Sequence, residues 1–570
     1  MRVLILHPAD RIPSDSKWDL VVDTARAPHA TFEAWSELTG GRVLSVYNYA
    51  EEIADLYRTK NLLEMGLGRM LDDQGVDWWD VCSLMISPEL QQLMLAKRVA
   101  AEFDASSEVH ATRDSWFVRG LQAVTTNRVM IHRRSSVLDR MRSAAEAICK
   151  LDGNELLQVL QDKFDNRHLL RGCITGRPPE TGSPVVLCPS AYVNVSHAVG
   201  SHAALWPEKQ FYLVVARRSA RINRLPANVR MAPLDGYFCR LNNDEFRSLL
   251  SAYEGLRGWL KSSSAEFLMA DAAGVLDRMP SLLRWGLAVR DAWNEIFESE
   301  NVVECFCADD SNPYTRIPLI LAKKRRLPTL ACHHGALDSR LAFKRSYADV
   351  HLVKSEMERD YTVRVCKVAE SQVVLQSPAA PLNLQRPGYK RQDCLIFFTE
   401  AYHSAGFREE EVYRDLLPSL LDAAQALGLV VVIKLHPFDS LRKMKRYVSA
   451  MLSSSDRARV RIWDGVMTEE RWQQARVAIT GQSSVALESQ AREIPTFLCG
   501  WLSDSLSGYQ KQFVRYGVGT FLDSAFDLAR IPELLSVRDT SVSQSPVRIL
   551  PLSKKNGRLE DAEPVRATHA

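Results

Sequence analysis

The sequence predicts an α/β fold in which two parallel β-sheets, each with helices on both faces, follow one another along the chain. Residues 185–390 and 393–536 both alternate short apolar segments with helical ones, a rhythm typical of parallel sheets. The 570 residues suffice for more than one hydrophobic core. A hydrophobic share of 46% and a charged share of 25% are those of an ordinary globular protein.

Residues 1–171 form the first region, which we expect to be an α/β extension of the fold. The predicted strands are Val3–Leu6, Leu20–Val22 and Val43–Val46, and the predicted helices are Glu51–Leu71 and Ser136–Phe164. Glycine and proline punctuate Gly172–Pro184, as is typical of a linker. The first region either completes the domain that follows it or folds by itself.

The second region, residues 185–390, resumes the α/β rhythm on both sides of a helical insertion at residues 243–298. Its predicted strands are Val185–Cys188, Phe211–Ala216, Val302–Cys307 and Thr329–Cys332. Its predicted helices outside the insertion are Ser196–Leu205 and Pro313–Arg326. These short apolar strands indicate a sheet that is buried on both faces.

The third region, residues 393–536, repeats the pattern. Its predicted strands are Cys394–Thr399, Leu429–Leu435, Val460–Trp463, Val477–Thr480 and Thr496–Cys499, and its helices include Glu409–Leu427 and Val485–Arg492. The second and third regions are thus predicted to be Rossmann-like domains with a ligand cleft between them. Residues 537–570 are rich in serine, proline and charge, which favours a weakly ordered tail.

Composition excludes several classes of protein. A net charge of +3 is too small for a nucleic-acid-binding surface. No apolar run approaches the roughly 18 to 20 residues that span a bilayer, and the apolar start is too short for a signal peptide. The eleven cysteines lack any Cys-x-x-Cys pair, which favours reduced thiols in a cytoplasmic protein.

Functional side chains are expected just after the strands, because ligands of such sheets bind at the carboxyl ends. The strand at residues 429–433 runs into Lys434, Leu435, His436 and Pro437. A cation and an imidazole at a strand end suit an anionic oxygen, and the histidine can donate a proton to a leaving phosphate. The alternative is a strand end with a hydrogen-bonded surface histidine.

The next strand but one, Val477–Thr480, is followed by a glycine turn that contains Ser483 and Ser484 and opens a helix. Serine hydroxyls and free amides at a helix start can bind phosphate. Glu488 lies one turn into that helix, where its carboxylate can accept hydrogen bonds from ribose hydroxyls. Plain helix capping is the alternative for the serines, and a favourable acid in the first turn is the alternative for Glu488.

Together, the His-Pro and Ser-Ser motifs resemble those of bacterial sialyltransferases, capsule β-Kdo transferases and CDP-glycerol glycerophosphotransferases. The resemblance covers about Val185 to Gly500 and implies a GT-B-like fold with a cytidine nucleotide donor. It implies that His436, Ser483 and Ser484 contact the donor phosphate and that Glu488 contacts the ribose. Lys434 and Pro437 belong to the same motif, with Lys434 as nearby positive charge.

These families carry two acids followed by glycine, and the second acid is the catalytic base. The nearest counterpart is Asp309-Asp310-Ser311, with serine in place of glycine. On physical grounds the two carboxylates follow a strand and precede a helix, and crowding is expected to raise the pKa of one of them. Asp310 is the first candidate and Asp309 the second, and the alternative is an aspartate that caps the helix.

Two further strand ends carry polar residues. His334 and Gly335 follow the strand at residues 329–332 and resemble a His-Gly pair of the same families, with His334 a catalytic candidate. Glu400 and His403 follow the first strand of the third region and are candidates to line the cleft. No cluster has the spacing of metal ligands, so we expect neither a metal nor a cofactor.

The sequence therefore predicts a metal-independent glycosyltransferase that moves a Kdo- or sialic-acid-type sugar from a CMP donor to a hydroxyl of a surface polysaccharide or glycolipid. An inverting reaction would use a base, and a retaining reaction would use Asp309 or Asp310 as nucleophile. We expect the protein to be cytoplasmic. The basic runs Lys323–Arg326 and Arg442–Arg446 are interpreted as solvated helix ends that complement the helix dipole, and the alternative is peripheral contact with anionic lipid at the inner membrane face. The alternatives are a UDP-sugar epimerase of the same architecture and a non-catalytic glycan- or nucleotide-binding scaffold.

Overall fold

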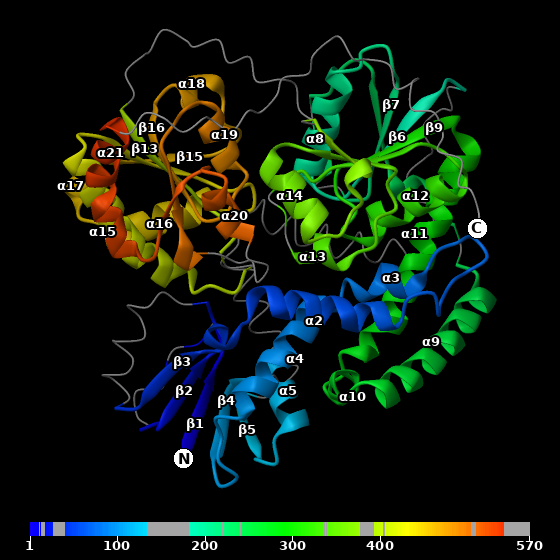
Figure 1. Ribbon diagram of the computed structural model, residues 1–570, viewed down its shortest axis with the longest axis horizontal. Coiled ribbons are helices and arrows are strands. Elements are labelled where there is room, and N and C mark those ends of the chain that lie inside the picture. Colours follow the sequence, from blue (N-terminus) through cyan, green and yellow to red (C-terminus); the bar gives the residue numbers. More distant parts are fainter. Residues whose placement is uncertain are drawn as a thin grey trace.

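The computed structural model contains three all-parallel sheets flanked by helices (Figure 1). The prediction of an α/β fold with two Rossmann-like domains is confirmed, and the first region adds a third sheet. The structure describes residues 1–540 except for 9, 11, 13–16, 27–39, 134–181, 218, 219, 223, 240, 336, 338, 377–392, 403, 404 and 503–508. The predicted helix Ser136–Phe164, most of the predicted linker and nearly all of the predicted tail lie outside these residues.

The N-terminal sheet has the order β3-β2-β1-β4-β5. Its strands are β1 (Arg2–Leu6), β2 (Leu20–Asp23), β3 (Arg42–Ser45), β4 (Glu108–Arg113) and β5 (Val129–Arg133). Helices α4 (Ser87–Ala100) and α5 (Trp116–Val124) supply apolar side chains that cover one face of the sheet. Strands β4 and β5 were not predicted, and in β4 polar residues interrupt the apolar pattern.

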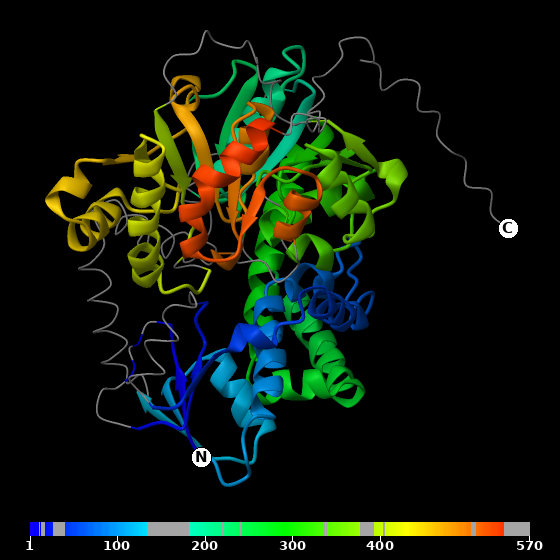
Figure 2. The same cartoon turned by 60° about the vertical axis from the view of Figure 1, so that its left-hand side comes forward.

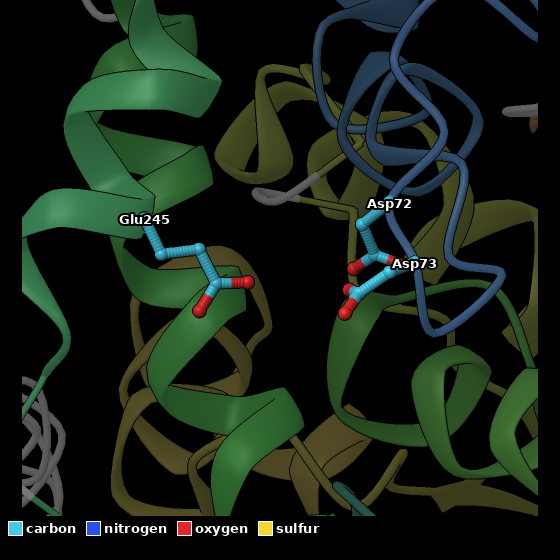
Figure 3. Close-up of side chains that lie close together, drawn as sticks. All are labelled: Asp72, Asp73 and Glu245. Atoms are coloured by element: carbon cyan, nitrogen blue, oxygen red, sulfur yellow. The ribbon is translucent and has the colours of Figure 1, made fainter.

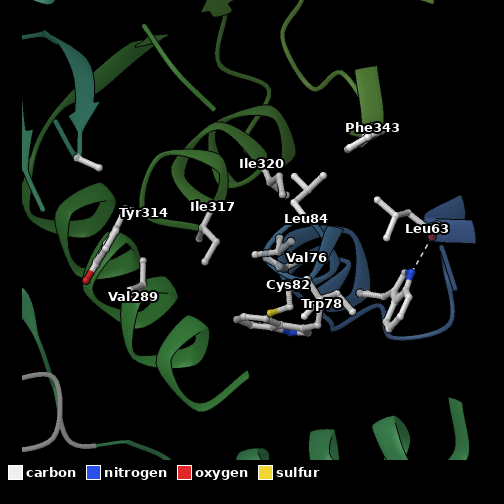
Figure 4. Packing of buried hydrophobic residues seen from close by; sticks show 14 of the residues in the cluster. Leu63, Val76, Trp78, Cys82, Leu84, Val289, Tyr314, Ile317, Ile320 and Phe343 are labelled. Carbon is white, nitrogen blue, oxygen red and sulfur yellow. Dashed lines mark hydrogen bonds between the residues drawn. The ribbon is translucent and has the colours of Figure 1, made fainter. Parts of the chain in front are cut away.

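Part of the first region packs into the core of the second. Helices α2 (Glu52–Met65) and α3 (Trp78–Ser83) bury apolar side chains in the cluster that also holds the middle sheet. Trp78 and Leu84 lie beside Ile317 and Ile320, which belong to a helix of the second region (Figure 4). Residues 52–94 therefore contribute to the core of the middle domain, whereas the end of α4 packs on the N-terminal sheet. That sheet forms a unit below the C-terminal domain in Figures 1 and 2.

The middle sheet has the order β12-β11-β10-β9-β6-β7-β8. Its strands are β6 (Val185–Ser190), β7 (Phe211–Val215), β8 (Val229–Pro233), β9 (Val302–Cys307), β10 (Thr329–Ala331), β11 (Val350–Val353) and β12 (Val373–Leu375). Helices α8 (Val193–Ala204), α12 (Pro313–Lys324), α13 (Ser339–Phe343) and α14 (Glu356–Arg364) connect the strands.

The helical insertion consists of α9 (Asn243–Ser263), α10 (Ala265–Ala272), a short 3-10 turn (Leu276–Arg278) and α11 (Met279–Ser299). Ser264 ends α9 and begins α10, because its hydroxyl accepts hydrogen bonds from the amides of Glu266 and Phe267. The predicted continuous helical stretch is thus broken into packed segments.

The C-terminal sheet has the order β15-β14-β13-β16-β17-β18. Its strands are β13 (Cys394–Phe398), β14 (Val430–Lys434), β15 (Val460–Trp463), β16 (Ala475–Thr480), β17 (Thr496–Cys499) and β18 (Thr520–Leu522). Its helices include α15 (Glu409–Ala426), α16 (Leu441–Met451), α19 (Val485–Ala491), α20 (Tyr509–Arg515) and α21 (Ile531–Thr540). Strand β13 lies between β14 and β16, so the predicted His-Pro and Ser-Ser loops leave the same edge of the sheet.

Candidate functional site

His436 follows β14 and is held in one orientation by the backbone. Its amide donates a hydrogen bond to Thr399 Oγ1 at 2.8 Å, and its Nδ1 accepts one from the amide of Phe438 at 3.2 Å. Burial, with the nearby charges of Lys434 and His334, lowers the pKa of His436 to about 4. The ring is therefore neutral at pH 7 and carries its proton on Nε2, where it can donate a hydrogen bond but does not bring a positive charge.

His334 comes from the other Rossmann-like domain, at the loop after β10. It lies close enough to His436 to contribute to the pKa shift of that ring. The rings of His333 and His334 are tilted against each other with centroids 4.9 Å apart. The structure therefore brings the predicted His-Gly and His-Pro loops of the two domains into proximity.

Lys354 anchors the loop that carries His334. Its ammonium donates hydrogen bonds to the carbonyls of His333 at 3.2 Å and Gly335 at 2.7 Å, and it pairs with Glu358 at 3.1 Å. Sequence reasoning missed this residue because strand β11, which it follows, was not recognised. A lysine directly after an apolar strand was the signal that could have found it.

Glu488 lies in the first turn of α19, in the C-terminal domain. Its side chain is exposed, yet the surrounding protein raises the pKa of its carboxyl, while Arg492 and Lys354 oppose that shift. Lys354 belongs to the middle domain, so its charge acts on Glu488 from across the domain boundary. His334, Lys354, His436 and Glu488 thus form one candidate site, which we call the junction site.

The loop before α19 is fixed by Glu400, which follows β13. Its carboxylate accepts a hydrogen bond from the amide of Gln482 at 2.6 Å. A Cβ atom at Gly481 would lie 2.8 Å from the same carboxylate oxygen, so only glycine fits there without a shift. Glu400 therefore shapes the loop that carries the two serines.

The two serines use their side chains differently. Ser483 Oγ accepts a hydrogen bond from the amide of Val485 at 3.3 Å. Ser484 is the N-cap residue of α19, and its side chain makes no capping hydrogen bond. The capping alternative thus applies to the Ser483 hydroxyl and not to that of Ser484.

Lys434 is turned toward its own backbone. Its ammonium is buried and donates to the carbonyl of Leu435 at 2.5 Å, and burial lowers its pKa, as does the charge of Arg471. Pro437, by contrast, is exposed beside His436. Predicted candidate His403 lies outside the described residues.

Asp310 differs from the prediction. Its side chain is 2% exposed and is paired with Lys344 and, at 3.4 Å, with Arg316. Burial alone would raise the pKa of this carboxyl, but Lys344 and Arg316 outweigh burial and lower it. The expected rise in pKa from the crowding of two acids is therefore wrong for Asp310. An ionised carboxylate held by two buried cations is suited to positioning them rather than to accepting a proton.

The helix after the two aspartates is not capped by either of them. Its N-cap residue is Asn312, whose side chain makes no capping hydrogen bond. Asp309 is also buried, and its carboxylate accepts a hydrogen bond from the amide of Ser311 at 2.9 Å. The alternative in which an aspartate caps α12 is thus wrong as well.

Within the described part of the chain, one group of acids has oxygen atoms close enough to hold a metal ion: Asp72, Asp73 and Glu245 (Figure 3). Arg290 donates hydrogen bonds to Asp72 at 3.1 Å and to both carboxylate oxygens of Glu245. The guanidinium already supplies the positive charge that these acids need. We therefore interpret the group as part of an ion-pair network in which Arg290 of α11 joins Asp72, in the loop between α2 and α3, to Glu245 of α9.

Among the described residues, no helix has the length and apolar composition needed to cross a membrane. Two lysines of the basic runs are engaged in ion pairs: Lys323 contacts Asp349 at 2.8 Å, and Lys443 contacts Glu409. Membrane contact through these runs stays a prediction.

Comparison with known proteins finds no matching family model and no matching curated protein. Among solved structures, the chain is similar to a protein described as a UDP-N-acetylglucosamine 2-epimerase from Listeria monocytogenes, with 10% identity, 63% and 88% of the two chains covered and a TM-score of 0.39. MurG of Acinetobacter baumannii is 11% identical, with 64% of this chain and 92% of MurG covered and a TM-score of 0.35. The wall teichoic acid polymerase TagF is 11% identical, with 71% of this chain and 90% of TagF covered and a TM-score of 0.36. Likenesses this weak carry no argument, and the fold class rests on the three parallel sheets of the chain itself.

Proposed function

We propose that the protein is a glycosyltransferase whose C-terminal domain binds a nucleotide-sugar and whose middle domain binds the acceptor. The observation that carries this proposal is the junction site, where His436 of one domain lies near His334 of the other. Sugar transfer between two substrates requires a donor group and an acceptor group to meet in this way.

The donor phosphate is assigned to His436 and Ser484. A neutral imidazole with its proton on Nε2 donates a hydrogen bond to a phosphate oxygen, and the Ser484 hydroxyl adds a second donor. Glu488 is assigned to the ribose hydroxyls. A CMP donor with a Kdo- or sialic-acid-type sugar rests on the motif resemblance, and transfer to a surface polysaccharide or glycolipid rests on the same ground.

His334 takes the role of base that the sequence first gave to Asp310. In an inverting transfer, the imidazole of His334 accepts the proton of the acceptor hydroxyl while the oxygen of that hydroxyl attacks the anomeric carbon of the donor sugar. The bond between that carbon and the donor phosphate breaks, and the nucleotide leaves with the electron pair. His436 stabilises the leaving phosphate by hydrogen bonding, without a metal ion. Lys354 positions His334 by holding the carbonyls on both sides of it.

The first test measures nucleotide affinity by calorimetry with CMP, CDP, UMP, UDP and GDP. We expect His436→Ala and the double variant Ser483→Ala, Ser484→Ala to weaken binding of the preferred nucleotide about tenfold or more, because each loses hydrogen bonds to a charged group. His197→Ala is the matched control, since His197 is exposed on α8 in the other domain. Wild-type affinity in both variants would contradict the proposal.

A second measurement separates the reaction classes. A transferase releases nucleotide only when an acceptor is present, and we expect that release to persist in EDTA. Release without acceptor would favour an epimerase, and no release with any acceptor would favour a binding scaffold. His334→Ala is expected to lower turnover about 10²- to 10⁴-fold while leaving nucleotide affinity unchanged.

A further inference from the structure

Arg217 lies at the carboxyl edge of the middle sheet, two residues after β7. Its guanidinium carbon is 5.3 Å from the ring centroid of Tyr192 and 5.8 Å from that of Tyr314. Tyr192 follows β6, the strand beside β7, and Tyr314 is in the first turn of α12. The half-buried guanidinium makes no ion pair within the described part of the chain.

The segment that leads into Tyr314 and α12 carries unpartnered polar groups. Asn312 is 4% exposed and Ser311 is 5% exposed. Neither polar atom of the Asn312 side chain, nor the Ser311 hydroxyl, has a hydrogen-bond partner among the residues that the structure describes. Buried polar atoms without a partner cost free energy, so three of them together indicate a site that is completed by a polar ligand.

We propose that Arg217, Ser311 and Asn312 bind an anionic group of the sugar acceptor, either a carboxylate or a phosphate monoester. A guanidinium offers a flat fork of donors that fits both groups, and stacking on two tyrosines fixes its orientation in advance. The dipole at the start of α12, a helix of 12 residues, also favours an anion. Asn312 can both donate to and accept from an adjoining sugar hydroxyl.

The neighbouring aspartates are engaged with buried cations. Asp310 is paired with Lys344 and Arg316, and the charge of Asp309 also acts on Lys344. Arg316 pairs with Asp80 as well, so two buried cations are shared among three buried carboxylates. An anion at this site therefore depends on Arg217, whose guanidinium pairs with no carboxylate of the described residues. That the ligand is the acceptor rests on the proposed function, whereas the preference for an anion rests on Arg217 and its surroundings alone.

The test is a ligand-observed NMR titration of the full-length protein with glucuronate, glucose 6-phosphate and glucose. We expect at least one of the two acids to bind more tightly than glucose, and the two arms decide between carboxylate and phosphate. Arg217→Gln should weaken binding of that acid about tenfold or more, and Arg217→Lys should weaken it less. Arg221→Gln is the control, because Arg221 is exposed four residues further on.

The inference would be overturned if folded Arg217→Gln bound both acids as tightly as the wild type does. It would also be overturned if the wild type bound neither acid more tightly than glucose. Nucleotide affinity, measured on the same samples, should be unchanged in the Arg217 variants. A wild type that binds the acid but no nucleotide would contradict the proposed donor site and still support this anion site.

Discussion

Asp310 lies in a chain of alternating buried charges that joins the first two regions. Arg316 contacts Asp310 at 3.4 Å and Asp80 of α3 at 2.7 Å, while Lys344 pairs with Asp310 from the other side. Each charge is stabilised by its neighbours in a low-dielectric interior, so none of them can be removed alone without cost. At the residue scale, this network explains why Asp310, an acid that follows a strand, stabilises the fold.

Asp310→Asn is therefore expected to destabilise the protein. Two buried cations lose their shared counter-charge, and breaking such a pair typically costs about 3–5 kcal/mol. Thermal unfolding should show a clear drop in melting temperature relative to wild type, and Asp309→Asn is the comparison. An unchanged melting temperature with lost turnover would restore Asp310 as a catalytic base.

His202 is a second residue whose environment fixes its charge. It is 3% exposed on α8, and its ring stacks on Phe306 with centroids 4.0 Å apart. Burial lowers its pKa to about 4, and Lys209 adds to that shift. The folded protein therefore keeps this imidazole neutral at pH values where the unfolded chain protonates it.

The consequence is a pH-dependent stability with a definite sign. Between pH 6.5 and 4 the unfolded chain binds more protons at His202, so the free energy of unfolding falls as the pH is lowered. His202→Phe should therefore reduce the drop in melting temperature between pH 7 and pH 5. A part of that drop will remain, because His436 and His351 also have pKa values of about 4 and still contribute to the pH dependence. The exposed His197→Phe variant is the control, and identical pH profiles for wild type and His202→Phe would contradict the argument.

At the scale of elements, α3 of the first region and α11 of the insertion meet through a glycine. A Cβ atom at Gly286 of α11 would lie 2.5 Å from the ring of Trp78, which is fully buried. The close approach of the two helices thus depends on the missing side chain. By contrast, no atom lies within 4 Å of the Cβ position at Gly255 of α9.

Gly286→Ala and Gly255→Ala are therefore expected to act in opposite directions. Alanine in a helix interior is favoured over glycine by about 0.5–1 kcal/mol, and Gly255→Ala should show that gain. At Gly286 the added methyl must displace a packed tryptophan, and overpacking typically costs about 1–3 kcal/mol. Denaturant unfolding of both variants is the measurement, and a stabilised Gly286→Ala would contradict the packing of α3 on α11.

The same scale shows what the sequence could predict. Strands β9, β15 and β17 begin and end at the predicted residues, because each is a short, mainly apolar segment bounded by polar or turn residues. Strand β4 was missed because Glu108, His110 and Arg113 break its apolar pattern.

The candidate site was predictable in part, for a similar reason. Positions after strands indicated which residues reach the sheet edge, including His334 and His436. The ion pair between Lys344 and Asp310 joins residues 34 apart, and it could not be inferred because it depends on packing between elements.

At the scale of the whole molecule, Arg408 joins the N-terminal sheet to the C-terminal domain. Its guanidinium donates hydrogen bonds to the carbonyls of His7 at 3.2 Å and Pro8 at 2.9 Å, and also to that of Asp10. It pairs with Asp23, at the end of β2, at 2.8 Å. Asp23 is fully buried, and burial raises the pKa of its carboxyl while Arg408 opposes that shift. One residue of α15's N-terminus thus covers the carboxyl edge of the N-terminal sheet.

Arg408→Met should loosen this connection. The substitution keeps an unbranched apolar stem but removes the cation that pairs with the buried Asp23 carboxylate and a donor to each of three carbonyls, so we expect a loss of about 3–5 kcal/mol at this interface. Hydrogen exchange should increase in β1 and β2 and remain unchanged in the middle sheet. Arg414→Met is the control, because Arg414 makes an exposed pair with Glu410 within α15, of the kind worth about 0–1 kcal/mol. Equal exchange of β1 and β2 in Arg408→Met and wild type would mean that other contacts hold the sheet. If exchange does increase while nucleotide affinity stays at the wild-type value, the N-terminal sheet is an appendage to the donor domain rather than part of its binding site.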